Sequence, residues 1–211
     1  GYKMILIMPE NQSAERKQTM KAFGAKLILT SAEGSMELAR DTALKMQEES
    51  EGIVLDQFGN QDNPKAHYDG TGPEIWRDTN HNVTHFVSSM GTTGTIVGTS
   101  KFLKEKNPDI KIIGVQPEDG AQIPGIRKWP DEYLPSIFTN KNIDHIELVS
   151  QKNAEETARK LAKTEGVFSG ASTGGALFIA LKLARDNPGS TIVSIACDRG
   201  DRYLSTGLFP S

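Results

Sequence analysis

The chain has 211 residues, enough for one large or two small α/β domains. Its 36% apolar and 24% charged residues exclude a disordered composition, and its net charge of −3 gives no electrostatic reason to expect nucleic acid or an anionic membrane as a partner. The longest apolar run near the start, residues 4–8, is too short to span a bilayer, and the single cysteine, Cys197, cannot form an internal disulfide, which fits a reducing, cytoplasmic compartment.

The first 55 residues predict alternating strands and helices. Strands are expected over residues 4–8, 26–29 and 53–55, and helices over residues 14–23 and 35–49. Ser13 can cap the first helix, and Gly24 stands where a helix-ending glycine belongs. This β-α-β-α-β order predicts a parallel sheet covered by helices. The polar residues 57–64 then predict a loop with a domain boundary or hinge.

The rest of the chain continues the alternation. Strands are expected over residues 83–88, 111–116, 146–149 and 191–196, helices over 71–78 and 153–164, and two further helices that end near residues 106 and 185. Between them, residues 120–138 are irregular and predict a functional loop.

A glycine-rich turn before the helix that ends near residue 106 is the sharpest chemical feature. It reads Gly91-Thr92-Thr93-Gly94-Thr95. Glycines let the backbone approach a ligand closely, and the unpaired N–H groups at a helix start suit a phosphate. The turn has no Walker lysine and does not match G-x-G-x-x-G, which favours a monophosphate over a nucleoside triphosphate. A tight turn that holds no ligand is the alternative.

A second turn of small residues, 169–175, also opens a helix. It predicts a hydroxyl, from Ser172 or Thr173, that faces a ligand; the alternative is a turn that serves close packing alone. Two such turns would meet at the carboxyl edge of one parallel sheet, where ligands bind in open α/β folds.

The histidines and the cysteine predict neither a metal site nor a hydrolase. His81 and His85 straddle a turn into a strand and would not share a helix face. His67 and His145 are expected to be surface or packing residues. Cys197 follows an apolar strand and precedes a charged run, so it is either a buried thiol or a thiol at the mouth of a site.

An ordered series of longer motifs runs along the chain. They are Asp56-Gln57-Phe58, Asn63-Pro64, Ala66-His67-Tyr68, Thr71-Gly72-Pro73-Glu74-Ile75-Trp76, Ser88-Ser89-Met90 with the glycine-rich turn, Pro124-Gly125-Ile126-Arg127-Lys128-Trp129, Tyr133-Leu134-Pro135 and Cys197-Asp198-Arg199-Gly200-Asp201-Arg202-Tyr203-Leu204-Ser205-Thr206. Together they resemble the B-type cysteine synthases of bacteria (O-acetylserine sulfhydrylase B), which depend on pyridoxal phosphate (PLP). The resemblance covers essentially the whole chain.

The resemblance implies a fold and a cofactor site. The fold is α/β, with two parallel-sheet three-layer domains of the tryptophan synthase β-like, fold-type II PLP type, incomplete at the N-terminus. Residues 1–60 would be the remainder of the smaller domain and residues 61–211 most of the larger, PLP-binding domain. Gly91, Thr92, Thr93, Gly94 and Thr95 would hold the cofactor phosphate, and Ser172 would hydrogen-bond the pyridine nitrogen.

The resemblance also implies a reaction. It is a β-replacement that makes L-cysteine from O-acetylserine and sulfide, or S-sulfocysteine from thiosulfate, in a cytoplasmic homodimer. Gln57 would lie near the substrate carboxylate, and Arg127 and Cys197 near the entrance, where they could select the sulfur donor.

The chain departs from the family pattern at one essential point. The family's Schiff-base lysine lies in a Ser-x-Lys-Asp-Arg-like motif and its substrate loop reads Thr-Ser-Gly-Asn-Thr-Gly, and neither occurs here; Lys3 and Lys17 stand in the wrong context. Together with a start at Gly1 in strand-like sequence, this predicts an N-terminally truncated chain without synthase activity of its own. The alternatives are a non-catalytic, ligand- or partner-binding remnant of the fold and another β-replacement enzyme such as cystathionine β-synthase.

Overall fold

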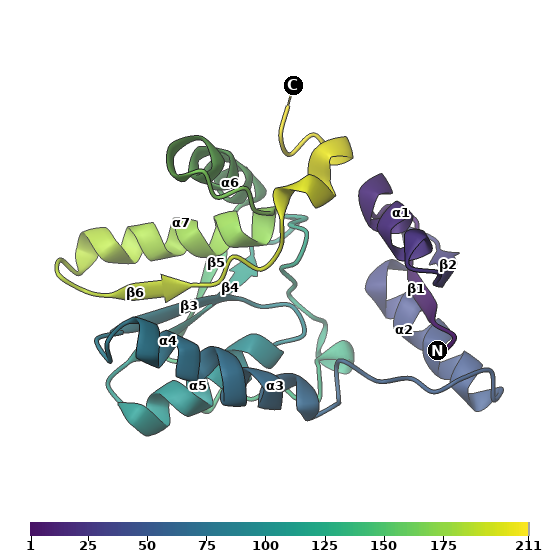
Figure 1. Cartoon of the computed structure of the whole chain (residues 1–211), viewed down its shortest axis with the longest axis horizontal. Helices are drawn as coiled ribbons and strands as arrows, with labels where there is room; N and C mark the ends of the chain where they lie inside the picture. Colours follow the sequence, from purple (N-terminus) through teal and green to yellow (C-terminus); the bar gives the residue numbers. More distant parts are fainter. Residues whose placement is uncertain (211) are drawn as a thin grey trace. The chain divides into compact units, whose positions relative to one another are not determined.

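A computed structural model describes residues 1–210 of the chain, which folds as two compact units (Figure 1). Unit 1 comprises residues 1–56 together with the chain from Asp201 onward, and unit 2 comprises Gln57–Gly200. The polar segment predicted to hold a boundary therefore begins where unit 2 begins. None of the helices within residues 1–210 combines the length and apolar character needed to cross a bilayer.

Unit 2 is built on a parallel sheet. Its strands are β3 (His85–Ser89), β4 (Lys111–Pro117), β5 (His145–Val149) and β6 (Ile192–Ser194), in the spatial order β5-β4-β3-β6. All pairs are parallel; in register, Val87 of β3 lies opposite Ile113 on one side and Ser194 on the other. Parallel strands covered on both faces are apolar throughout, and Phe86, Val87, Ile112 and Ile113 are buried accordingly.

Helices cover both faces of this sheet and complete a three-layer arrangement. They are α3 (Asp62–Ala66), α4 (Gly72–Asp78), α5 (Gly94–Lys106), α6 (Gln151–Glu165) and α7 (Ala171–Asp186), with a π-helical turn at His67–Thr71 and a 3₁₀ turn at Asp131–Tyr133. Figure 1 shows α6 and α7 over one face and α3, α4 and α5 over the other. Ile96 and Leu103 of α5 pack into the core with Phe86 and Ile112. The predicted parallel α/β architecture is confirmed.

Unit 1 is smaller and has a shallow core. It holds β1 (Ile5–Pro9), α1 (Ala14–Ala22), β2 (Lys26–Thr30) and α2 (Ser35–Glu48), and β1 and β2 pair in parallel. The Ser13 hydroxyl caps α1 by accepting the Arg16 N–H, and Gly24 takes a left-handed φ of +83°, both as expected from their residue types. The C-terminal 3₁₀ segment Gly200–Thr206 joins this unit through Ser205, whose N–H and hydroxyl donate to the Glu15 carboxylate at 2.9 and 2.7 Å.

The predicted strand over residues 53–55 is wrong. Ile53 and Leu55 are 88% and 73% exposed, and no strand among residues 1–210 pairs with them. The Val54 N–H donates to the Gln47 side chain at 2.7 Å instead of to a neighbouring strand. An apolar run of three residues forms a strand only where its backbone can hydrogen-bond to a neighbouring strand. Here a side chain takes the place of that neighbour.

Two boundaries also differ from expectation. The predicted polar loop over residues 57–64 gives way to α3 at Asp62, so Asn63 and Pro64 are helical. The second small-residue turn does not precede its helix: α7 begins at Ala171, and Ser172 and Thr173 lie in its first turn.

Candidate functional site

The candidate site lies at the carboxyl edge of the unit 2 sheet, where three strands end and each is followed by a segment that carries predicted site residues. The glycine-rich turn follows β3, the loop with Arg127 follows β4, and Cys197 follows β6. The strand β3 has β4 on one side and β6 on the other, so the connections diverge at this point of the sheet. Ligands bind at such switch points in open α/β folds.

Thr93 is the most unusual residue of the first turn. It forms the N-cap of α5 with φ +75°, a left-handed conformation that is strained for a β-branched residue. Its side chain is only 4% exposed, and its hydroxyl has no hydrogen-bond partner within the described chain. The first N–H groups of α5, beginning at Gly94, also lack acceptors inside the helix. A buried, unpaired hydroxyl beside the first amides of a helix is suited to bind an anion.

Two glycines on α5 let the helix α3 lie against it. A Cβ built on Gly94 would come within 1.8 Å of Asn63 Oδ1, and a Cβ on Gly98 within 2.0 Å of the Pro64 carbonyl oxygen. Gly94 therefore serves the packing of Asn63 as well as the turn. This close approach brings polar groups of α3 to the back of the glycine-rich turn.

Asn63 and His67 bond to the threonines of that turn from behind. Asn63 Nδ2 donates to the Gln57 carbonyl oxygen at 2.7 Å and to Thr92 Oγ1 at 3.1 Å. His67 Nε2 lies 3.2 Å from Thr95 Oγ1. Burial lowers the pKa of His67, so the ring is neutral at neutral pH and adds no charge to the site.

The second turn is fastened to the end of β3. The Ser89 hydroxyl donates to the Ser172 carbonyl oxygen at 2.7 Å. Ser172 is 2% exposed, and a Cβ on Gly125 would lie 3.0 Å from its Oγ, so Gly125, at φ +88°, lets the loop after β4 pass close by. The two small-residue turns are thus adjacent, as predicted.

Cys197 lies next to that second turn. Its N–H donates to Thr173 Oγ1 at 3.2 Å, and its Sγ lies 3.5 Å from the Ile195 carbonyl oxygen. The residue is exposed, but desolvation of its sulfur raises the pKa of the Cys197 thiol, while a side-chain hydrogen bond with Ser172 lowers it in part. Because the pKa lies above its ordinary value, the thiol is protonated and uncharged at neutral pH.

The loop after β4 folds back over the glycine-rich turn. The Arg127 N–H donates to the Met90 carbonyl oxygen and Trp129 Nε1 to the Gly91 carbonyl oxygen, both at 2.7 Å. The Arg127 guanidinium stacks over the Trp129 ring, 4.7 Å from its centroid, and Phe58 meets the same ring edge-on at 5.3 Å. A half-buried cation is therefore held beside the turn by an aromatic partner.

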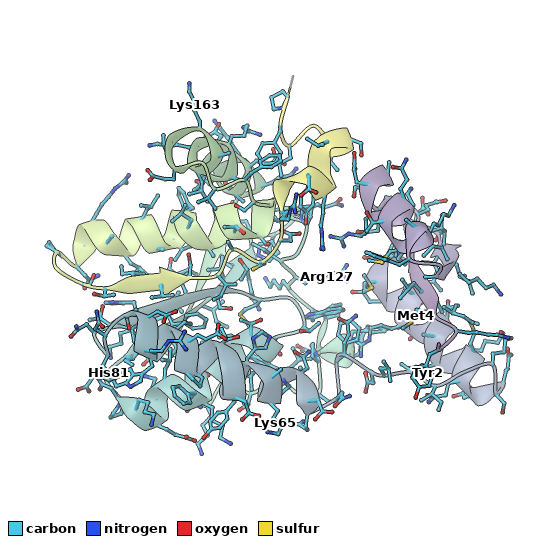
Figure 2. All side chains as sticks on the ribbon, viewed as in Figure 1. Tyr2, Met4, Lys65, His81, Arg127 and Lys163 are labelled. Carbon is cyan, nitrogen blue, oxygen red and sulfur yellow. The ribbon has the colours of Figure 1, made fainter. Side chains whose placement is uncertain are left out.

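His81, one of the two histidines considered for a metal site, lies away from the candidate site. His81 stacks on Trp76, with ring centroids 4.7 Å apart, at the opposite end of unit 2 from Arg127 (Figure 2). Among residues 1–210, no group of three His, Cys, Asp or Glu side chains is arranged to hold a metal ion.

The structure links the predicted site residues into one network. Asn63 joins Gln57 to Thr92, the Met90 carbonyl joins Arg127 to the turn, and Ser172 contacts Cys197. Sequence reasoning missed the linking residues Asn63 and Ser89. Each had a usable signal, since both stand in motifs that carry the family resemblance and Ser89 is also a polar residue at the end of an apolar strand.

Comparisons with known proteins agree with this geometry. Residues 1–198 match the family described as "Pyridoxal-phosphate dependent enzyme". The chain is 57% identical over 209 residues to cysteine synthase B of Pseudomonas aeruginosa, covering 99% of the chain and 70% of the relative. It is 56% identical to cysteine synthase B of Escherichia coli, covering 99% of the chain and 69% of the relative.

Solved structures give the same picture. The cysteine synthase of Entamoeba histolytica superposes with a TM-score of 0.90 at 40% identity, covering 99% of this chain and 65% of that one. An O-ureido-L-serine synthase superposes with a TM-score of 0.91 at 30% identity, covering 99% and 69%. The chain thus spans about two thirds of the length of these proteins, and by sequence and fold it belongs to the pyridoxal-phosphate-dependent enzyme family, on the branch of the cysteine synthases.

Proposed function

We propose that this chain carries the cofactor- and substrate-binding part of a PLP-dependent cysteine synthase. The reaction is β-replacement, which converts O-acetylserine and sulfide to L-cysteine, or thiosulfate to S-sulfocysteine. In the same proposal, residues 1–60 belong to the smaller domain and residues 61–211 to the larger one of a cytoplasmic homodimer. The observation that carries it is the buried hydroxyl of Thr93 at the start of α5, which has no hydrogen-bond partner in the part of the chain that the structure describes.

The residues of the first turn fit a phosphate monoester. Gly91 and Gly94 leave room for backbone approach, and Thr92, Thr93 and Thr95 supply hydroxyls beside the amides of the helix start. All these donors are neutral, and no lysine stands in the turn, so the charge of a triphosphate would lack a countercharge. PLP has one phosphate on a flat ring, and this donor set matches it.

Around such a ring, the other site residues have separate tasks. Ser172 offers a neutral hydroxyl to the ring nitrogen, while Gln57 offers its amide to the substrate carboxylate. When bound, PLP supplies an electron sink for loss of the β-substituent, and a hydroxyl instead of a carboxylate at its ring nitrogen moderates that sink and favours elimination over transamination. The Ser89 bond to the Ser172 carbonyl keeps this serine in place.

The choice of sulfur donor is assigned to Arg127 and Cys197. The Arg127 guanidinium is half-buried and stacked on Trp129, so it can attract an anion larger than sulfide. Cys197 is uncharged because its pKa is raised, so its thiol does not repel that anion. This combination supports acceptance of thiosulfate.

The chain by itself is proposed to lack turnover. Lys128 stands on the same loop as Arg127, but it pairs with Asp119 at 2.8 Å. No lysine of the sequence has the family's Schiff-base context. This observation favours the second candidate function, a non-catalytic protein that binds the phosphorylated cofactor or a partner.

Binding and turnover together test both candidates. Equilibrium dialysis of the 211-residue chain against pyridoxine 5′-phosphate is expected to show binding that is lost in Thr93→Val, which keeps the side-chain shape but removes the hydroxyl. Cysteine formation from O-acetylserine, sulfide and PLP is expected to stay at the level without protein. Equal binding of wild type and Thr93→Val would refute the phosphate site, and turnover would refute the proposed inactivity.

A further inference from the structure

We propose that Asn63 is a positioning residue that sets the Thr92 hydroxyl to donate to the cofactor phosphate. The inference rests on the proposed function, because it concerns the same phosphate site. It names a residue on α3, outside the glycine-rich turn, as part of what makes that turn selective for an anion.

The hydrogen-bond geometry fixes the direction of the Thr92 hydroxyl. Asn63 Nδ2 spends one proton on the Gln57 carbonyl oxygen at 2.7 Å and the other on Thr92 Oγ1 at 3.1 Å. The Gly94 N–H lies 3.5 Å from the same Thr92 oxygen. A hydroxyl has two lone pairs and one proton, so when N–H groups occupy its acceptor side, its proton is left for an external acceptor.

The orientation of the Asn63 amide is itself determined. Turning the amide over would place Oδ1 against the Gln57 carbonyl oxygen, with two acceptors at 2.7 Å and no proton between them. The Asn63 Oδ1 occupies the space that a side chain at position 94 would fill, 1.8 Å from the ideal Cβ position, so the glycine lets the amide pack against the start of α5 in this orientation. Asn63 is therefore held as a donor to Thr92.

Asn63→Asp tests this role because it keeps the shape and reverses the polarity. The carboxylate accepts hydrogen bonds only, so it repels the Gln57 carbonyl and draws the Thr92 proton toward itself. The phosphate then loses a donor and gains a negative neighbour. Affinity for a phosphorylated ligand is expected to fall about 10- to 100-fold, while affinity for the unphosphorylated ligand changes by less than about threefold.

The measurement is the ratio of two dissociation constants of the full 211-residue chain, for pyridoxine 5′-phosphate and for pyridoxine. Both ligands lack the aldehyde, so neither reacts with surface lysines. Gln61→Glu is the matched control, since it adds the same charge two residues away on an exposed side chain. Its ratio is expected to stay within about threefold of wild type.

A double-mutant cycle shows whether Asn63 acts through Thr92. Asn63→Ala is expected to raise this ratio of dissociation constants in the wild-type background, because only the phosphorylated ligand binds more weakly, and to have no further effect in Thr92→Val, where the hydroxyl is gone. These variants also carry the test if Asn63→Asp does not fold, which its far-ultraviolet circular dichroism would reveal.

The outcomes separate the two proposals. A wild-type chain that binds both ligands equally would overturn the phosphate site, and with it the proposed function. A wild-type chain that prefers the phosphate, with an unchanged ratio in Asn63→Asp or additive effects in the cycle, would overturn the role of Asn63 and leave the proposed function standing.

Discussion

Replacing Thr93 with glycine is expected to stabilise the ligand-free chain and to weaken its hold on a phosphate. Thr93 combines a left-handed backbone at φ +75° with a buried hydroxyl that has no hydrogen-bond partner among residues 1–210. Both features cost folding free energy, and both serve an anion that is bound at the start of α5. A site of this kind trades stability for binding.

The magnitude follows from four effects of the substitution. Relief of the left-handed strain is worth about 1–2 kcal/mol, and removal of a buried, unpaired hydroxyl about 1–3 kcal/mol. Against these, loss of the buried methyl costs about 1 kcal/mol, and the greater freedom of glycine in the unfolded chain about 0.5–1 kcal/mol. The central values give a rise in the free energy of unfolding of about 2 kcal/mol, or roughly 4–8 °C in Tm, and the extremes of the four ranges give about 0–3.5 kcal/mol.

Urea unfolding followed by circular dichroism measures the change, with and without pyridoxine 5′-phosphate. Asn80→Gly is the matched control, because Asn80 also has a left-handed φ, +49°, but is exposed and of a residue type that tolerates this conformation. Its free energy of unfolding is expected to change by less than about 0.5 kcal/mol. A destabilised Thr93→Gly, or one that binds the phosphate as tightly as wild type, would refute the reasoning.

Three further perturbations probe the packing around the site and the two units. Gly94→Ala should lower the free energy of unfolding, measured in urea, by about 1–3 kcal/mol, because the new methyl displaces Asn63. A Cβ on Gly189 meets no atom within 4 Å, so Gly189→Ala should lower the free energy of unfolding only by the backbone strain of an alanine at φ +82°. Burial raises the pKa of Asp144, but its bonds to Lys104 and to the Ile112 N–H outweigh this and leave it below the ordinary 3.8. Its stabilisation is thus present above that pH and lost as pH falls through the lowered pKa, so Asp144→Asn should flatten the acid limb of the stability profile by about 1 kcal/mol; an unchanged limb would contradict the assignment. Ser205→Ala should speed amide hydrogen exchange in residues 201–206, because the Glu15 carboxylate keeps the backbone N–H donor of residue 205 but loses the hydroxyl donor, and exchange equal to wild type would show that the segment is held by other contacts.

Local chemistry accounts for the parts of the fold that were predicted. Gly24 and the Asn107-Pro108 pair mark helix ends because a left-handed glycine and a proline cannot continue a helix, and α1 and α5 end beside them. The strand–turn–helix of the candidate phosphate site could also be predicted from neighbouring residues, since it is marked by apolar strand residues, two glycines and three threonines that are close together in the sequence. The strand over residues 53–55 failed because a strand also needs a neighbour, which composition does not reveal.

The part of the site that lies behind the turn depends on packing between distant segments. Asn63 is 29 residues from Thr92, and the two meet because Gly94 and Gly98 let α3 approach α5. From the sequence alone, Gly94 predicts a tight turn, and nothing in the spacing of Gly94 and Gly98 points to a partner helix. The residues proposed to contact a ligand can therefore be recognised by their type, whereas the residues that orient them are recognised only once the neighbouring helix is in place. Gly94 accordingly has two roles, one in the turn proposed to hold the phosphate and one in the packing of Asn63.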